Sequence, residues 1–347
     1  MRQLDDRKER VLEAVVIEYI LDAEPISSDL IANKYHLGVR AATIRNELAE
    51  MEELGYLDQP HTSAGRIPSD KGYRYYVDSL MNCSPVSRSS KNKVKHLTEE
   101  GDVLISLVQE TTKLVSKMTS LMSCAIIFQH TDIYLKNLIL HSLGQQRVLL
   151  NLVLSNGHVE NRFIEVPIGL TAKDLQKINQ IFSKELEDHT LLYILQWTES
   201  SAHIDLFKPE MHSFQSTLRV SLTHIIKELM KGHLFTEGEE YMLSQPEFHK
   251  NQLYWRDLLY SLTDEDALYI ALSKDIGPKE TITIGKENLL EHLHSFSLIK
   301  RKIYTGENET GTLALMGPTR LNYEKCIPLL NFAAESISTT LTHYLSI

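Results

Sequence analysis

A helix-turn-helix pattern within the first 55 residues constrains the fold of this chain more than any other feature. Six apolar residues recur at helical spacing ahead of Pro25 and predict a first helix: Val11, Leu12, Val15, Val16, Tyr19 and Ile20. Ser27 suits the N-cap of a short second helix, and Leu37-Gly38-Val39 is expected to form the turn after it. A third helix has its apolar residues on one face: Ile44, Leu48, Met51 and Leu54. Gly55 follows it in the position of a left-handed cap.

The tract after this third helix predicts a wing. Residues 59–68 are rich in turn-forming residues, with Gly65 at the expected bend of a β-hairpin loop. Three tyrosines follow within residues 72–77: Tyr73, Tyr75 and Tyr76. They suit either base stacking, as in single-strand binders, or a buried helix that anchors the wing, and we favour the helix. Residues 1–82 therefore predict a winged helix-turn-helix domain.

The next segment changes in composition. Residues 83–98 predict a basic linker, because they hold a proline, several serines and four basic residues but no acidic one. A helix is expected at 99–122, where leucines and methionine recur at three and four positions. Its apolar stripe suits either packing on a following sheet, which we favour, or a dimeric coiled-coil seam.

From residue 124 onward the pattern alternates between strands and helices. Strands are expected at 125–128, 133–140, 148–154, 159–166, 281–284, 298–304 and 312–316. Asn156-Gly157 predicts a hairpin turn. Helices are expected at 171–186, through Leu268, at 287–294 and at the C-terminus. These patterns predict an α+β chain with one mixed α/β domain in two parts, 99–188 and 261–347, interrupted by an insertion at 189–260.

The distribution of charge tests whether such a chain could bind nucleic acid. The formal net charge is −10, from 36 lysines and arginines against 46 aspartates and glutamates, whereas DNA-binding domains usually carry a basic surface. Residues 1–80 hold ten basic and fifteen acidic residues, a net charge of −5. The basic residues are segregated, however: 31–46 contains no acidic residue, and 59–77 has a net charge of +2.

The third helix offers a small polar face suited to a DNA groove. With Ile44 in the core, Ala42, Arg45, Asn46 and Ala49 fall on or near the opposite face, at about 100° per residue. In a major groove, arginine fits guanine, asparagine fits adenine and a methyl group meets thymine. The alternative is an ordinary solvated face. Acidic residues occupy the distal half of this helix and are expected to point away from DNA: Glu47, Glu50, Glu52 and Glu53. Arg66 beside Gly65 is expected to reach a phosphate or the minor groove.

Other classes of site have little support in the sequence. It contains no P-loop, GxGxxG or HExxH motif, and no nucleophile, base and orienting group can be assembled, so we expect no catalysis and no cofactor. His292 and His294 would not share a helix face, which disfavours a metal site. Residues 317–320 either present amides to an anion or form a plain strand-to-helix turn, which we favour.

Compartment and redox state follow from what the sequence lacks. No apolar stretch approaches the length of about 20 residues that a membrane span needs, and no secretory signal is legible, so the cytoplasm is expected. Cys83, Cys124 and Cys326 are widely spaced, which predicts reduced thiols.

Several runs of residues resemble the heat-inducible transcription repressor HrcA family. The most specific are ATIRNEL at 42–48, GYL at 55–57, QPHTSAGRIP at 59–68 and GYR at 72–74. Further matches are QPEF at 245–248, GKEN at 285–288, Gly311 and GPTR at 317–320. Three positions depart from the family pattern. Arg40 replaces a usual serine, which removes a helix cap and adds a cation. Ser27 replaces a favoured glycine, and Asn322 replaces an aspartate but can still cap.

The resemblance implies a winged-helix DNA-binding domain, a GAF-like domain and a dimerising insertion. It also implies repression of chaperone operons at an inverted-repeat operator, the CIRCE element. A GroEL-type chaperonin would keep the repressor active, and activity would be lost on heat stress. We expect DNA contacts from eleven residues: Arg40, Ala42, Thr43, Arg45, Asn46, His61, Thr62, Ser63, Arg66, Lys71 and Arg74.

Two functions therefore remain open at the level of sequence. The first is a homodimeric repressor that binds double-stranded DNA and carries out no covalent chemistry. The alternative is a winged-helix regulator whose GAF-like domain senses a small metabolite, which rests on analogy of fold.

Overall fold

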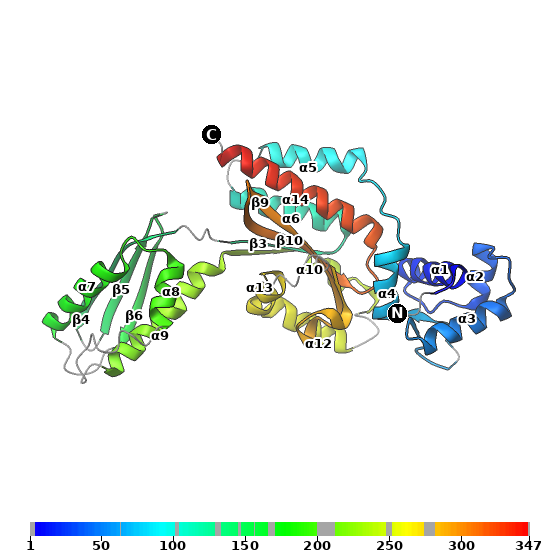
Figure 1. The fold of residues 1–347 in the computed structure, drawn as a ribbon, viewed down its shortest axis with the longest axis horizontal. Coiled ribbons are helices and arrows are strands. Elements are labelled where there is room, and N and C mark those ends of the chain that lie inside the picture. The colour runs from blue at the N-terminus through cyan, green and yellow to red at the C-terminus, as the bar shows by residue number, and fades with distance from the viewer. Residues whose placement is uncertain are drawn as a thin grey trace. The chain divides into compact units, whose positions relative to one another are not determined.

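The computed structural model describes residues 4–62, 64–100, 104–128, 133–144, 147–155, 157–165, 171–199, 212–247, 252–273 and 282–345. The chain divides into two compact units (Figure 1). Unit 1 consists of Met1–Ile127 and Leu234–Ile347, and unit 2 of Phe128–His233. A stretch in the middle of the chain is thus inserted into a unit that both ends of the chain build.

The N-terminal part of unit 1 has the expected three helices. They are α1 (Asp6–Asp22), α2 (Ser28–Tyr35) and α3 (Ala41–Glu53). The Ser27 hydroxyl accepts a hydrogen bond from the Leu30 N–H at 3.2 Å, which confirms the predicted cap of α2. Arg40 occupies the N-cap of α3 without a side-chain capping bond, as its substitution for serine predicts. Gly55 has φ +79°, which confirms the left-handed position after α3.

A short hairpin and a helix complete this part. Strands β1 (Leu57–Asp58) and β2 (Ile67–Pro68) pair antiparallel, and α4 (Asp70–Tyr75) runs into the π-helical turn η1 (Tyr76–Leu80). Gly65 is needed for a different reason than the expected bend, because its φ is not positive. A Cβ there would lie 2.3 Å from the carbonyl oxygen of Ile26, which pairs with Arg66. Three helices followed by a β-hairpin are typical of winged helix-turn-helix domains.

The rest of unit 1 is built around a five-stranded sheet with strand order β7-β3-β10-β9-β8. Its strands are β3 (Met122–Ile127), β7 (His233–Glu237), β8 (Ile282–Ile284), β9 (Phe296–Thr305) and β10 (Asn308–Pro318). Strand β10 pairs antiparallel with β3 and with β9, and β8 pairs antiparallel with β9. The strands predicted at 125–128, 298–304 and 312–316 are confirmed, whereas Thr281 of the strand predicted at 281–284 lies outside the described residues.

Helices lie on both sides of this sheet (Figure 1). On one side are α5 (Arg88–Glu100), α6 (Leu104–Thr119) and α14 (Tyr323–Leu345). On the other are α10 (Glu239–Leu243), α12 (Gln252–Thr263) and α13 (Glu265–Ser273). Helix α6 packs against β3 and α14, as the favoured reading of its apolar stripe predicted. Asn322 caps α14, because its Oδ1 accepts from the Lys325 N–H at 3.1 Å.

Two predictions in this domain were wrong. Residues 83–98 are not a linker throughout, because α5 begins at Arg88 after Ser87, whose hydroxyl accepts from the Ser90 N–H at 3.1 Å. Val94 of α5 is fully buried and the helix packs on α14. The serine-rich composition of this segment gives no indication of that contact. Residues 287–294 form no single helix but two 3₁₀ turns, η4 (Gly285–Glu287) and η5 (Glu291–Leu293).

Unit 2 is a separate α+β body. Strands β4 (Leu135–Gly144), β5 (Arg147–Leu154) and β6 (Val159–Glu165) form an antiparallel meander. Its helices are α7 (Ala172–Leu186), α8 (Leu191–Glu199) and α9 (His212–Lys231). The β5–β6 hairpin contains Gly157 at φ +82°, as expected, while Asn156 lies outside the described residues.

The insertion therefore has other boundaries than the predicted 189–260. Residues 99–188 were predicted to belong to the mixed α/β domain, but β4, β5 and β6 form a three-stranded sheet of their own within unit 2. Residues from Leu234 onward belong to unit 1 instead of the insertion. Hydrophobic periodicity identifies a strand but does not tell which sheet it joins, and this explains the error.

Candidate nucleic-acid interface

The N-terminal half of α3 presents the polar face that the sequence predicted. Ile44 is fully buried, while Ala42, Arg45 and Asn46 are exposed and Thr43 is half-buried. Arg40, one residue before the helix, is exposed as well. Among the described residues, no hydrogen bond or ion pair engages the side chains of Arg40, Arg45 or Asn46. These three side chains are therefore available to a ligand.

Ion pairs neutralise most of the acidic residues on the distal half of α3. Arg7 contacts Glu47, Lys8 Nζ lies 3.0 Å from Glu50, and Arg66 Nη2 lies 2.8 Å from Glu52. The hydrogen bond to Glu50, followed by that to Asp5, raises the pKa of Lys8. Three of the four carboxylates thus have a cation beside them, which reduces their repulsion of a nearby phosphate backbone. These ion pairs make the acidic helix α3 compatible with DNA binding.

The wing tip is organised by one amide side chain. Gln59 Nε2 donates to the carbonyl oxygens of Thr62 at 3.0 Å and Ala64 at 2.9 Å. His61 and Thr62 are exposed at this turn, and Ser63 lies outside the described residues. The described part of the tip thus presents small polar groups on a restrained loop.

The remaining basic residues predicted to contact DNA are engaged within the protein. Arg66 holds Glu52, and its side chain is only 16% exposed. Lys71 Nζ donates to the Leu54 carbonyl oxygen at 2.6 Å and lies 4.2 Å from the centre of the Tyr56 ring. Arg74 is bound through Glu287 to the part of unit 1 that contains the five-stranded sheet, which we call the second domain. The structure thus leaves the α3 residues and the described part of the wing tip exposed but gives these three cations intramolecular partners.

The tyrosines and the second helix support the recognition unit. Tyr73 and Tyr76 are each 1% exposed, so they anchor α4 as the favoured interpretation holds. Lys34 Nζ bonds Glu18 at 2.7 Å, and the hydroxyl of Tyr35 bonds the same carboxylate at 2.6 Å. Burial alone would raise the pKa of Glu18, but these two bonds bring it below its ordinary value. The buried Glu18 therefore ties α2 to α1.

The GPTR run is a structural turn. Arg320 forms an ion pair with Glu247, and its Nη2 donates to Gln245 at 2.8 Å. Its Nη1 donates to the carbonyl oxygen of Ile20 in α1 at 3.2 Å. The guanidinium is thus committed to partners within the protein, which agrees with the favoured interpretation of residues 317–320 as a turn.

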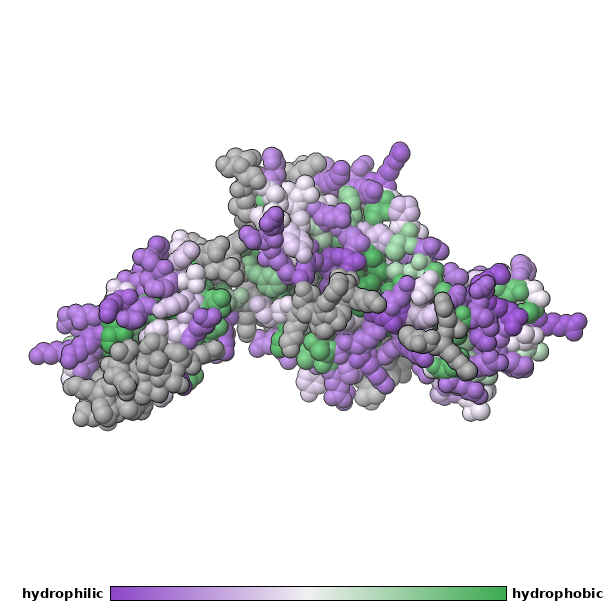
Figure 2. Space-filling view, viewed as in Figure 1, coloured by the Kyte–Doolittle hydropathy of each residue, from purple (hydrophilic) through white to green (hydrophobic). Residues whose placement is uncertain are grey.

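The described surface over the helix-turn-helix unit, α1–α3, is mainly hydrophilic on the face drawn in Figure 2. No described helix is both long enough and apolar enough to cross a membrane. Within the described ranges, no group of three or more histidine, cysteine, aspartate or glutamate side chains is arranged to hold a metal ion.

The exposed N-terminal end of α3, the β1–β2 wing and the α+β domain that follows them together define a class of protein. This class is the helix-turn-helix transcription regulator with an additional domain. Comparisons with known proteins make the class specific. The family model described as the HrcA protein C-terminal domain matches residues 106–327. The heat-inducible transcription repressor HrcA of Symbiobacterium thermophilum is 36% identical over 341 residues, which cover 96% of this chain and 98% of that protein. The HrcA of Moorella thermoacetica is 35% identical and covers 98% of both chains. This chain therefore belongs to the HrcA family.

The fold is also found among solved structures. A crystal structure described as that of a hypothetical protein at 2.2 Å resolution aligns with a TM-score of 0.57 and 21% identity. The alignment covers 98% of this chain and 99% of that one, so the likeness extends over the whole architecture.

Proposed function

We propose that this protein represses the transcription of heat-shock genes by binding duplex DNA at an inverted-repeat operator, the CIRCE element, in front of chaperone operons. The base-reading groups are Arg45 and Asn46 of α3, with the methyl groups of Ala42 and Thr43 beside them. His61 and Thr62 of the wing approach the backbone, and Ser63 of the same loop is included as a prediction. The protein acts as a binding module and carries out no covalent chemistry.

The observation that carries this proposal is the contrast along α3. Its N-terminal half presents Arg45 and Asn46, which have no partner within the described part of the chain, whereas three of its distal carboxylates are neutralised by Arg7, Lys8 and Arg66. An arginine can bond guanine bidentately and an asparagine can bond adenine in the major groove. The lack of a side-chain cap at Arg40 leaves first-turn N–H groups for a phosphate oxygen.

An inverted repeat requires two copies of the chain. Two recognition helices enter successive major grooves when they lie about 34 to 36 Å apart, so a twofold dimer matches a palindrome. We assign the dimer contact to the insertion, unit 2. On β6, Ile164 is buried but its neighbour Phe163 is 72% exposed, opposite Leu149 of β5. A second copy would cover the exposed ring of Phe163.

The regulatory part of the proposal comes from membership of the family. The curated relatives carry the name heat-inducible transcription repressor. We propose that the second domain is GAF-like and that a GroEL-type chaperonin maintains the DNA-binding form, which is lost on heat stress. The antiparallel sheet with helices on both sides supports the GAF-like assignment.

The test is a gel-shift titration at fixed salt with three duplexes of equal length. They carry the inverted repeat found upstream of chaperone genes, a single half-site, and a scrambled repeat. We expect tight binding to the repeat, with affinity about 10³-fold or more above the scrambled duplex. The titration is repeated with added chaperonin, which should raise the active fraction. Equal affinity for all three duplexes with and without chaperonin would refute sequence-specific repression.

A metabolite-sensing function is the second candidate, and one cavity favours it. This cavity of about 720 Å³ is lined by apolar groups such as Met81 and Ile327 and by four charged side chains: Arg74, Asp78, Glu287 and Arg301. Arg301 has no carboxylate partner among the described residues, and its burial lowers the pKa of the guanidinium. A small acid suits one part of this lining, with its carboxylate beside Arg301 and its apolar body against Met81 and Ile327. A ligand at 100 times its Kd would stabilise the protein by about 2.7 kcal/mol, so thermal shifts with a panel of such acids test the idea.

A further inference from the structure

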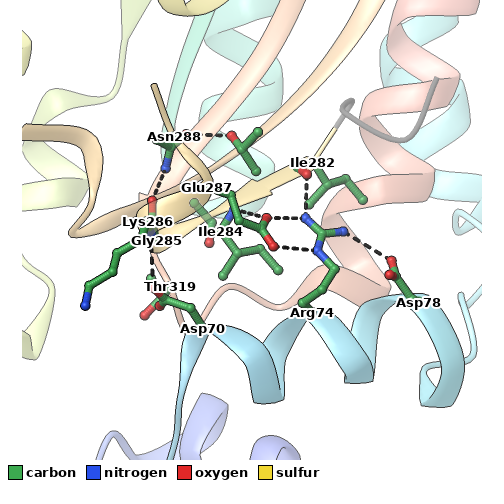
Figure 3. Close-up of polar contacts among 12 residues, drawn as sticks. Asp70, Arg74, Asp78, Ile282, Ile284, Gly285, Lys286, Glu287, Asn288 and Thr319 are labelled. Atoms are coloured by element: carbon green, nitrogen blue, oxygen red, sulfur yellow. Dashed lines mark hydrogen bonds and ion pairs between the residues drawn. The ribbon is translucent and has the colours of Figure 1, made fainter. Parts of the chain in front are cut away.

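The helix that follows the wing is bound to the second domain by an arginine fork. Arg74 of α4 donates from Nε to Glu287 Oε1 at 2.9 Å, and its Nη2 also contacts this carboxylate (Figure 3). Nη2 donates to the Ile282 carbonyl oxygen at 2.6 Å, and Nη1 lies 3.1 Å from Asp78 Oδ1. Two parallel bonds between a guanidinium and a carboxylate fix orientation as well as distance. The pair is largely shielded, with side-chain exposures of 22% for Arg74 and 35% for Glu287.

A second contact from the same helix reaches the neighbouring residues of the GKEN run. Asp70 Oδ2 accepts a hydrogen bond from the Lys286 N–H at 3.0 Å (Figure 3). Gly285 has φ +55°, and a Cβ there would lie 2.2 Å from the Asp70 carboxylate oxygens. Only glycine therefore allows this approach without a shift of the loop or of α4.

The loop that receives both contacts is itself rigidly built. Asn288 Nδ2 donates to the carbonyl oxygens of Gly285, Leu293 and Phe296 at 2.9, 3.0 and 2.8 Å. Its Oδ1 accepts from the buried hydroxyl of Thr283. A buried amide whose hydrogen bonds are all made restrains the loop around it to a single conformation. The GKEN run is thus a preformed socket for α4.

We propose that Asp70 and Arg74 are positioning residues for operator binding. With Gly285, Lys286 and Glu287 they form a clasp that holds α4 on the second domain, and α4 belongs to the same winged helix-turn-helix domain as the recognition helix α3. The inference rests on the proposed dimeric repressor and deepens it: the clasp sets the register of the two recognition helices on an inverted repeat. The sequence predicted that Arg74 contacts DNA. In the clasp its positive charge instead pairs with Glu287.

The physical consequence is specific to the two-site complex. When one subunit of a dimer is bound at its half-site, the recognition helix of the other subunit is held near the second half-site. Its effective concentration there depends on how rigidly that helix is held. When the helix is fixed in the binding geometry, less orientational freedom is lost at the second site. Opening the clasp should therefore weaken binding to the full repeat and leave binding to a single half-site unchanged. A general folding defect would weaken both, and so would the loss of a phosphate contact.

Charge reversal across the clasp tests this directly. The full-length variants Arg74→Glu, Glu287→Arg and the double exchange are titrated against the full repeat and the half-site duplex. We expect each single variant to lose about tenfold in affinity for the full repeat and less than about twofold for the half-site. The double exchange should recover most of the full-repeat affinity, although its glutamate cannot donate to the Ile282 carbonyl. Gly285→Ala provides a second route, because it crowds Asp70 without changing any charge, and it should reproduce the selective loss.

Each alternative outcome has a definite meaning. If the double exchange remains as weak as Arg74→Glu and both are weak on the half-site, Arg74 contacts phosphate and the inference fails. Unchanged full-repeat binding in every variant also overturns it, as does tighter binding, because then the clasp would oppose the DNA-bound form. Failure of the unmodified protein to prefer the full repeat would instead refute the proposed function.

Discussion

Arg45→Ala is the substitution that most sharply separates base reading from simple charge attraction. Arg45 is exposed and has no partner among the described residues, so its removal should change the free energy of unfolding by less than about 0.5 kcal/mol. A bidentate arginine–guanine contact contributes about 1 to 3 kcal/mol of discrimination per half-site. A dimer contains two such contacts, so the full repeat should lose about 2 to 6 kcal/mol. At 1.4 kcal/mol per tenfold, its affinity falls by about 30-fold to 10⁴-fold.

The assay is a gel-shift titration on the full repeat and on duplexes changed at one symmetric base-pair position at a time. The variant should become indifferent to one position while it still discriminates at the others. Arg219→Ala is the matched control, because Arg219 is an exposed arginine of α9 without an ion pair among the described residues. It removes the same charge and should bind the repeat normally. The reasoning is refuted if Arg45→Ala binds the repeat like the unmodified protein, or if it loses the same factor on the scrambled duplex.

Three further predictions follow from packing and burial. Gly65→Ala should lower the free energy of unfolding of the N-terminal part by about 2 to 3 kcal/mol, because it breaks the two 2.9 Å hydrogen bonds between Ile26 and Arg66. Thermal melts should show a smaller loss for Gly38→Ala, which meets no atom within 4 Å. Burial raises the pKa of Cys124 and Cys326 to about 12, so Ellman's reagent should titrate only Cys83 until the protein is denatured. Burial also raises the pKa of Asp70 above 3.8, so its contribution to stability is fully present below that pH and declines as pH rises through the folded-state value. Asp70→Asn cannot ionise, and its stability relative to the unmodified protein should therefore increase from about pH 4 to pH 7; a constant difference would contradict the assignment.

Local sequence signals were enough to predict the helix-turn-helix unit. The apolar stripe of α1, the Ser27 cap and the left-handed Gly55 all act within a few residues of one another. The same is true of the uncapped start of α3 at Arg40. Elements whose identity depends on distant partners were harder to predict. Helix α5 has a polar composition and is stabilised by packing Val94 against α14, which begins more than 200 residues later in the chain.

In the candidate site, too, features set by local sequence could be predicted and features set by distant partners could not. Arg45 and Asn46 could be placed on the exposed face because the phase of one helix determines it. The fates of Arg66 and Arg74 depend on Glu52 and Glu287, and Glu287 is 213 positions away from Arg74. No spacing rule predicts such a pair. The GKEN run, which resembles the family pattern, is the sequence signal that marks this loop.

Selection of bound duplexes from a random pool tests the central claim most directly, because it assumes no operator. The unmodified full-length protein, with chaperonin present, is incubated with the pool at fixed salt, and the retained duplexes are sequenced. We expect enrichment of one inverted repeat whose half-site centres lie a whole number of helical turns apart, at about 10 to 10.5 base pairs per turn. Arg45→Ala should select the same repeat with one symmetric position relaxed. Recovery of unrelated sequences without symmetry would contradict it.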